Sequence, residues 1–499
     1  MKKAILLLAI IATCNVACRD WLDVAPEMQQ KESDLFGSYR GFRDALTGCY
    51  MSMADRAIYG ERLTITNIES LANLWYLPDN STREEDGYLT RHDYQKDAPG
   101  ARALAVIYGK LFNTIAQANV ILKNIRLTGD VIPDPATRAV IEGEAYAIRA
   151  YCQFDALRLF GQLPRGATRI VELPYSETAS LDDMPAYYGF DAYVTRLKSD
   201  VEKALALLEE NDPLFQYSFG QLNGPVLDDT YLLFRQSRLN YYAVKALQAR
   251  LYLYLGEREN AHAVAMELIA PAGGGDPVSR MSGLDDLTPA SSGVDPFPAL
   301  PSECLFYLSK YNVKDYTTAY LIGGEGSLFN NTRLGLTPLM RAELYAGQDV
   351  SAHNRYHNLW AEVYTAASAP HYATKKYWYK DDASSLMLKR QIIPMLRVSE
   401  VYLIAIETST DLDEVNALYK EYMTAHNVML TTGYFTSLAA VQAEILAEYR
   451  REFFAEGQMF YAYKRVGAAN MLWRAAAVEE GEYVLPLPET EFNPNTLNQ

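Results

Sequence analysis

Aromatic and amide side chains gather in one short, turn-ending stretch of the sequence. The stretch "ANLWYLPDN" (72–80) contains Asn73, Trp75, Tyr76 and Asn80, and its Pro-Asp-Asn end favours a turn over a helix. An exposed aromatic ring can stack on the flat C–H face of a sugar, while amide groups satisfy the surrounding hydroxyl groups. These residue types therefore favour a binding surface for a polyhydroxylated ligand.

A second group of aromatic residues follows in the middle of the chain, between residues 271 and 394. The chain has 37 Tyr and only 17 Phe, and Tyr combines an apolar ring with a polar tip. We expect most helical tyrosines to pack between helices, so the candidates come from loop-like segments, where Tyr311, Tyr356, Tyr372 and Tyr379 also lie. The predicted ligand-binding residues are Asn73, Trp75, Tyr76, Asn80, Tyr316, Tyr320, Trp360 and Trp378.

No arrangement typical of a catalytic centre is present in the sequence. Neither a G-x-S-x-G elbow nor a Walker loop occurs. His353 and His357 could share a helix face and bind a metal, but no Glu follows His353 as a zinc protease needs. Acidic pairs such as Asp182-Asp183 leave a glycosidase-like carboxylate pair open. We expect a non-catalytic protein without a cofactor, although the oxygen-rich "DNSTREED" (79–86) leaves calcium as an open alternative.

The N-terminus is typical of an exported protein. Two lysines precede the apolar run "AILLLAIIA" (4–12), which is shorter than the roughly 20 residues of a membrane-spanning helix and fits a signal peptide. The small residues before Cys18 resemble the lipobox of bacterial lipoproteins, which implies removal of residues 1–17 and acylation of Cys18 by palmitate-like chains. Because each buried methylene contributes about 0.8 kcal/mol, such chains would anchor the protein to a membrane. A plain secretory signal is the alternative.

Charge and cysteine content exclude several classes of protein. Removal of residues 1–17 changes the formal charge from −16 to −18, because it removes Lys2 and Lys3. Such a chain is a poor match for nucleic acid, whose affinity comes from basic residues on phosphates. Beyond Cys18 only Cys49, Cys152 and Cys304 remain, and this odd, sparse set is no disulfide framework.

Most of the chain has the periodicity of amphipathic helices, with Gly and Pro at their ends. "ALQARLYLYLGERENAHAVA" (246–265) looks like a tetratricopeptide unit, with a Gly at the turn between two helices. Because one helix hairpin cannot bury its own apolar face, neighbouring hairpins must stack. The predicted helices are 108–125, 141–159, 190–208, 239–255, 261–269, 395–406, 411–426 and 438–467.

The predicted fold class is therefore mainly all-α, a tetratricopeptide-like array of helix hairpins with a loop-rich insertion and a few short strands. We divide the mature chain into an arm and helical part (18–270), the insertion (271–394) and C-terminal helices (395–499). The last part is expected to pack with the first as one domain. Arg397 and Glu400, spaced i, i+3, are expected to form a local ion pair.

Seven segments in order resemble the SusD/RagB family of nutrient-binding outer-membrane lipoproteins of Bacteroidetes. They include "CRDWLDVAP" after the predicted acylation site, "GEAYAIRAYCQFDALRLFGQLP" at Gly143 and "EYRREFFAEGQMFYAYKRVG" at Glu448. The others are "GFRDALTGCYMSM", "YGKLFNTIAQANVILKNI", "IPMLRVSEVYLIAIET" and "LPLPETEFNPN". The run from Gln458 to Tyr463 departs from the family pattern and indicates a divergent branch.

The resemblance implies both a function and a place in the cell. A family member captures a glycan or oligosaccharide at the surface of the outer membrane and delivers it to a partner TonB-dependent transporter barrel, which it covers as a lid. Trp75 resembles one stacking ring of the family's site. Two alternatives stay open: a lipoprotein that binds peptides for uptake, and a secreted glycosidase with a carboxylate pair across an aromatic cleft.

Overall fold

A computed structural model of the chain describes residues 32–77, 84–179, 184–270, 281, 303–317, 321, 334–364, 370–377, 391–431 and 433–491. The predicted signal peptide and Cys18 lie outside the described residues, as do Asn80, Tyr320 and Trp378. Among the helices of the described part, none is long and apolar enough to cross a membrane.

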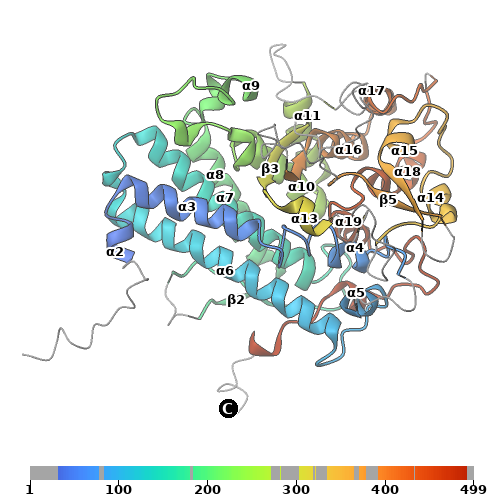
Figure 1. The fold of residues 1–499 in the computed structure, drawn as a ribbon, viewed down its shortest axis with the longest axis horizontal. Coiled ribbons are helices and arrows are strands. Elements are labelled where there is room, and N and C mark those ends of the chain that lie inside the picture. The colour runs from blue at the N-terminus through green and yellow to red at the C-terminus, as the bar shows by residue number, and fades with distance from the viewer. Residues whose placement is uncertain are drawn as a thin grey trace, which may run out of the picture.

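Antiparallel helices form the body of the molecule (Figure 1). One end holds the N-terminal helices and the other end the C-terminal helices, and α11 packs against α16 where the two groups meet. The predicted mainly helical fold class is confirmed. The long helices are α3 (Tyr39–Met53), α6 (Pro99–Thr128), α7 (Pro135–Phe160), α8 (Phe190–Leu208), α10 (Tyr241–Leu255), α11 (Arg258–Ile269), α16 (Val398–Thr408), α17 (Leu412–Ala425), α18 (Leu438–Glu452) and α19 (Met459–Val466).

Local sequence signals explain where these helices begin and end. The Asp134 side chain accepts a hydrogen bond from the Thr137 amide at 2.8 Å, and Pro135 occupies the first turn of α7. Gly256 adopts a left-handed conformation, with φ +78°, and turns the chain from α10 into α11. The predicted hairpin at 246–265 is therefore confirmed, as is the helix at 190–208.

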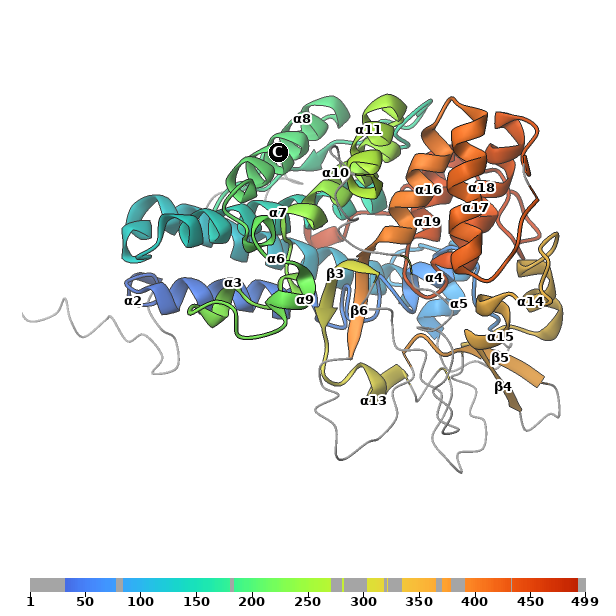
Figure 2. The same cartoon turned by 90° about the horizontal axis from the view of Figure 1, so that it is seen from above.

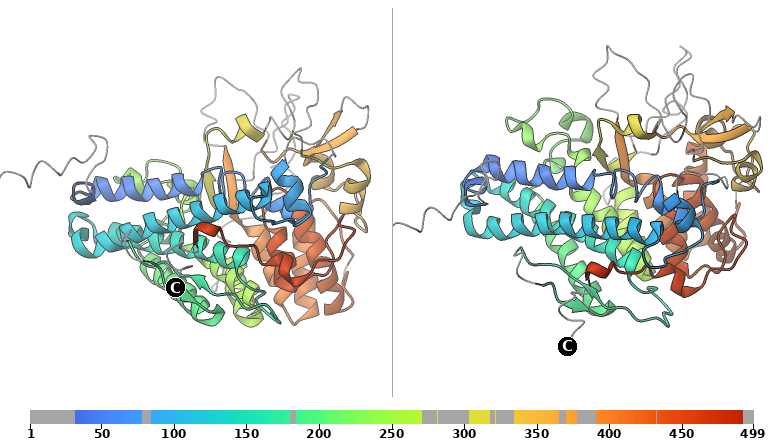
Figure 3. Two further views of the ribbon diagram at one scale, coloured as in Figure 1. Left: turned by 90° about the horizontal axis from the view of Figure 1, so that it is seen from below. Right: turned by 60° about the horizontal axis from the view of Figure 1, so that its bottom comes forward.

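The insertion contributes short elements along one side of the helical body (Figure 2, with a second view in Figure 3). Strand β3 (Cys304–Ser309) pairs antiparallel with β6 (Ile392–Arg397), and β4 (Trp360–Tyr364) forms a hairpin with β5 (Pro370–Thr374). Three short helices accompany them, namely α13 (Val313–Thr317), α14 (Pro338–Leu344) and α15 (Asn354–Asn358). The few short strands expected for this segment are confirmed.

Two predicted helices differ from the observed elements because tertiary contacts override the local pattern. The segment predicted as a helix from 395 begins as the end of β6, whose apolar run contains Pro394, and only then becomes α16. The helix predicted for 438–467 is broken between α18 and α19. There the buried Glu69 carboxylate accepts hydrogen bonds from the amides of Ala455 and Gly457, at 3.0 and 2.8 Å.

The local ion pair predicted between Arg397 and Glu400 is wrong. Arg397 instead contacts three carboxylates from two separate segments, Glu303 at 2.9 Å, Glu452 at 2.7 Å and Glu456 at 2.8 Å. Glu400 pairs with Arg250 of α10 at 2.5 Å. These pairs are buried, and they join the insertion and the C-terminal helices to the rest of the body. Removal of one partner would leave a buried charge unpaired, which would destabilise the fold.

Candidate functional site

The predicted binding residue Trp75 lies inside the protein. Its side chain is 3% exposed, and its indole Nε1 donates a hydrogen bond to the Ile65 carbonyl at 2.9 Å. Asn73 is buried as well and donates from Nδ2 to the Thr90 carbonyl at 3.2 Å. A stacking plate needs a free ring face, so the expectation that Trp75 is exposed is corrected: its contacts are structural.

Two predicted residues of the insertion are also buried. Trp360 begins β4 and packs edge-to-face on Phe454, whose ring also receives the edge-to-face contact of Trp75. The Tyr316 hydroxyl donates to the Gly60 carbonyl at 2.5 Å. The expected exposure of Trp360 and Tyr316 is therefore wrong, because each ring fills the space between the insertion and the helical body.

Tyr76 is the predicted binding residue that the structure leaves partly open to solvent. Its side chain is 38% exposed, and its ring lies 5.3 Å from the ring of His371 at an interplanar angle of 33°. The backbone explains the approach. The Tyr76 amide donates to the Gly335 carbonyl at 3.0 Å, and neighbouring Leu336 pairs with Tyr372 of β5. Gly335 therefore lies between the Tyr76 segment and strand β5. Because it has no side chain, it leaves room for the two rings to approach each other.

A stacked guanidinium lies at the next residue of β5, Tyr372, and because successive strand residues point to opposite faces it lies on the other side of the strand from His371. The Arg341 guanidinium of α14 is 3.8 Å from the ring centroid of Tyr356 and 4.2 Å from that of Tyr372. Its Nη2 donates to the Tyr356 carbonyl at 2.5 Å, while the buried Nε has no hydrogen-bond partner among the described residues. The rings hold the guanidinium in one orientation, which favours specific hydrogen bonding.

We define the candidate binding surface as Tyr76 and His371, and treat Arg341 with Tyr356 and Tyr372 as a neighbouring group on the other side of β5. The sequence analysis named the three tyrosines among the loop aromatics but missed His371 and Arg341. His371 belongs to the short segment "PHYAT" (370–374), which has no strict alternation of apolar and polar residues to mark it as a strand. Arg341 has no local signal, because its aromatic partners come from two other elements.

Three predicted residues, Asn80, Tyr320 and Trp378, lie outside the described residues, but the described chain ends nearest to them approach one another. Thr317, before Tyr320, donates from its hydroxyl to the carbonyl of Tyr377 at 3.4 Å. Tyr76, four residues before Asn80, contacts β5 as described above. Their roles as binding residues stay predictions.

The described residues supply no grouping of His, Cys, Asp and Glu suited to a metal ion. His353 is buried, and burial lowers its pKa to about 2, whereas His357 is exposed and shares a hydrogen bond with the Val350 carbonyl at 2.8 Å. Of the acidic stretch 79–86, the described Glu85 and Asp86 face structural partners such as Asn67.

These elements define a SusD-like protein fold: a stack of helix hairpins with short strands and helices of an insertion along one side. A protein of the SusD superfamily from Bacteroides thetaiotaomicron has a similar structure, with TM-score 0.67 at 20% identity over 92% of this chain and 98% of that one. A SusD-like carbohydrate-binding protein from Bacteroides vulgatus gives TM-score 0.68 at 15% identity, over 92% and 97%.

A third solved structure, a laminarin-binding SusD-like protein, gives TM-score 0.62 at 17% identity over 91% of this chain and 97% of that one. No protein-family model matches the sequence, and no curated protein matches it. The resemblance found in the sequence is thus confirmed at the level of the fold.

Proposed function

We propose that this chain is a non-catalytic glycan-binding lipoprotein of the bacterial cell surface. The carrying observation is the partly exposed Tyr76–His371 ring pair, on a fold shared with proteins described as carbohydrate-binding and laminarin-binding. Aromatic rings that carry polar atoms, the Tyr76 hydroxyl and the His371 ring nitrogens, match a ligand with apolar C–H faces ringed by hydroxyl groups.

Binding would divide between the ring pair and the neighbouring Arg341 group. Tyr76 and His371 would stack on a sugar face and exclude water from it. A longer ligand that also reaches the other side of β5 would meet Arg341, which Tyr356 and Tyr372 already order and which would donate to hydroxyl or ring oxygens with little further loss of side-chain entropy. No step of bond cleavage is part of this proposal.

Membrane attachment and delivery form the second part of the proposal. Acylation of Cys18 would hold the protein at the outer membrane, where it would pass its glycan to a partner TonB-dependent transporter barrel. The lipobox-like sequence and the SusD-like fold support this arrangement. Mass spectrometry of Cys18 and co-purification of a barrel protein from the native membrane test it.

The decisive experiment measures glycan binding by soluble protein that begins at Arg19. An array of neutral and acidic glycans and of peptides identifies the ligand, and titration calorimetry gives its Kd with calcium and with a chelator. We expect a glycan to bind and Tyr76→Ala to weaken it by at least about tenfold. Tyr434→Ala is the matched control, because Tyr434 is also 38% exposed but lies between α17 and α18.

Each other outcome has a defined meaning. Equal affinity in the Tyr76→Ala and Tyr434→Ala proteins would remove the proposed surface. Binding of peptides alone would replace the glycan with the peptide alternative, and release of shortened sugars from a glycan substrate would show a glycosidase. Binding that disappears with the chelator would make calcium part of the site.

A further inference from the structure

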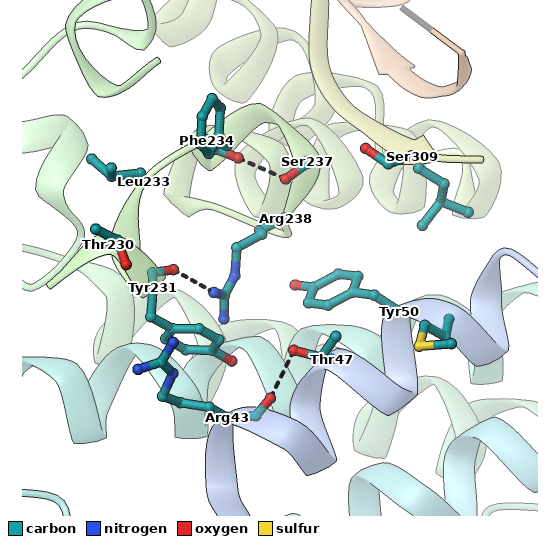
Figure 4. Close-up of a pocket in the computed structure, with 12 residues that line it drawn as sticks. Arg43, Thr47, Tyr50, Thr230, Tyr231, Leu233, Phe234, Ser237, Arg238 and Ser309 are labelled. Atoms are coloured by element: carbon teal, nitrogen blue, oxygen red, sulfur yellow. Dashed lines mark hydrogen bonds between the residues drawn. The ribbon is translucent and has the colours of Figure 1, made fainter. Parts of the chain in front are cut away.

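A separate groove lies between the N-terminal helices and the insertion, away from the candidate binding surface (Figure 4). Its walls are α3, the turns η3 (Thr230–Leu232) and η4 (Arg235–Ser237), and the end of β3. Its volume is about 390 Å³, within the range of roughly 300–1,000 Å³ of small-molecule sites. The fold therefore contains a second space large enough for a ligand.

Two arginines and a tyrosine form the floor of this groove. The guanidinium carbons of Arg43 and Arg238 lie 4.8 and 4.0 Å from the ring centroid of Tyr231. Arg238 is only 7% exposed. Its Nε donates to Glu144 at 2.9 Å and its Nη1 to the Tyr231 carbonyl at 2.8 Å, which fixes the direction of the guanidinium.

Part of this floor has unused hydrogen-bonding capacity. Arg238 Nη2 and the Tyr231 hydroxyl are buried, and among the described residues neither has a hydrogen bond of good geometry beyond the interaction of these two side chains with each other. Arg43 forms no ion pair within the described part of the chain and keeps only its ring contacts. Buried donors without partners are costly, so a ligand that accepts hydrogen bonds here would stabilise the groove.

The charge of the lining selects the kind of ligand. The described residues that line the groove include no Asp or Glu, although the chain as a whole carries a net charge of −16. The nearest carboxylates are already engaged, Glu144 behind Arg238 and Asp229 with the Tyr39 hydroxyl. Guanidinium groups recognise carboxylates through paired N–H donors, so an acidic group fits the floor.

The remaining lining favours a sugar as the carrier of that acidic group. Hydroxyl groups of Thr47, Ser237 and Ser309 line the walls, as the close-up shows, and suit a ligand rich in hydroxyls. Phe234 supplies an exposed apolar side chain from a left-handed backbone, with φ +55°. Such backbone strain in a bulky residue is typical of positions that serve a function.

We propose that this groove is a second binding site, which takes the carboxylate-bearing unit of an acidic sugar such as a uronic acid. The carboxylate contacts Arg43 and Arg238, the sugar hydroxyls contact the walls, and Phe234 covers an apolar face. The site is independent of the Tyr76 surface, so it stands or falls separately from the function proposed above.

The test is titration calorimetry of the soluble protein with digalacturonic acid, its neutral digalactose counterpart and inorganic phosphate. We expect saturable binding of the diuronate only, weakened at least about tenfold by Arg43→Gln and also by added salt. Arg40→Gln is the matched control, because Arg40 lies on the same helix, is 88% exposed and pairs only with Asp44. Tyr76→Ala should leave diuronate binding unchanged.

Every other result overturns the proposal. Equal binding of the neutral sugar would show that the arginines do not select the ligand, and equal phosphate binding would show a general anion site. Binding of an Asp- or Glu-rich peptide without the diuronate would make the groove a protein contact. No loss in the Arg43→Gln protein, or the same loss in the Arg40→Gln protein, would place the ligand elsewhere.

Discussion

Trp75 and Tyr76 are neighbours in the sequence but belong to different regions of the molecule. Trp75 points into a sealed aromatic cluster with Phe454 and Trp360, whereas Tyr76 lies at an open strand edge beside His371. The alternation of side chains along an extended segment explains this difference, because successive residues point to opposite faces. Ring type and loop position therefore indicate a binding region, while the direction of each side chain decides which ring is available.

The largest expected effect concerns the sealed cluster. Phe454→Ala removes the ring shared by Trp75 and Trp360, and we expect a loss of about 3–5 kcal/mol in the free energy of unfolding from lost burial and the cavity left behind. Urea unfolding measures this loss. A loss below about 1 kcal/mol would show that the two tryptophans do not depend on this ring.

Gly335→Ala attacks the backbone arrangement that joins the two regions. A Cβ at this position would lie 2.9 Å from the Tyr372 carbonyl oxygen, so the strand must shift, at a cost of about 1–3 kcal/mol. We expect glycan affinity to fall as well, because Tyr76 is hydrogen-bonded to this residue. Gly347→Ala is the control for backbone strain without a steric clash, because its site has open space for a Cβ but a φ of +83°.

Acid sensitivity separates the buried from the exposed histidines. Burial lowers the pKa of His353 in the folded protein, so as the pH falls below about 6.5 the unfolded chain takes up the proton first and the folded state loses stability. His353→Phe should reduce the slope of unfolding free energy against pH between about 6 and 4 by about 1.4 kcal/mol per pH unit. His426 and His92, whose pKa values burial also lowers, retain their own contributions.

His371→Asn serves as the control for this slope, because its ring lies at the open edge rather than in the interior. A His353→Phe protein with the wild-type slope would contradict the assignment of acid sensitivity to the interior.

Tyr76→Ala should have the smallest effect on stability. A half-exposed ring at a strand edge contributes little to folding, so we expect the free energy of unfolding to change by no more than about 0.5 kcal/mol. The same protein should lose glycan affinity, as proposed above. A large loss of stability would instead place Tyr76 with Trp75 as a structural residue.

Helix positions could be predicted from the sequence, but side-chain exposure could not. The pattern from Phe190 to Leu208 specifies a helix by itself, and Gly256 marks its own turn. The burial of Trp75, in contrast, depends on Phe454 near the other end of the chain. The break before α19 is marked locally by Gly457, which has φ +75°, but it also depends on the distant Glu69 carboxylate, which no local pattern reveals.

The candidate surface could be predicted only in part, because it too depends on contacts between residues that are distant in the sequence. Tyr76 lies in the stretch that the residue types indicated, but Arg341 gains its meaning only when α14 lies against two tyrosines from α15 and β5. The groove at Arg43 and Arg238 could not be predicted from the sequence, because its two arginines are far apart in the chain and neither belongs to a recognisable motif.

The pairing of β3 with β6 has a consequence for how such a protein can diversify. These two strands directly precede residue 310 and directly follow residue 391. Their pairing therefore holds the two ends of the segment 310–391 close together. Lengthening a turn within that segment costs little loop-closure entropy while its two ends remain paired. New side chains can thus be introduced at its exposed turns, whereas buried residues such as Tyr316 and Trp360 must be kept because they pack against the helical body.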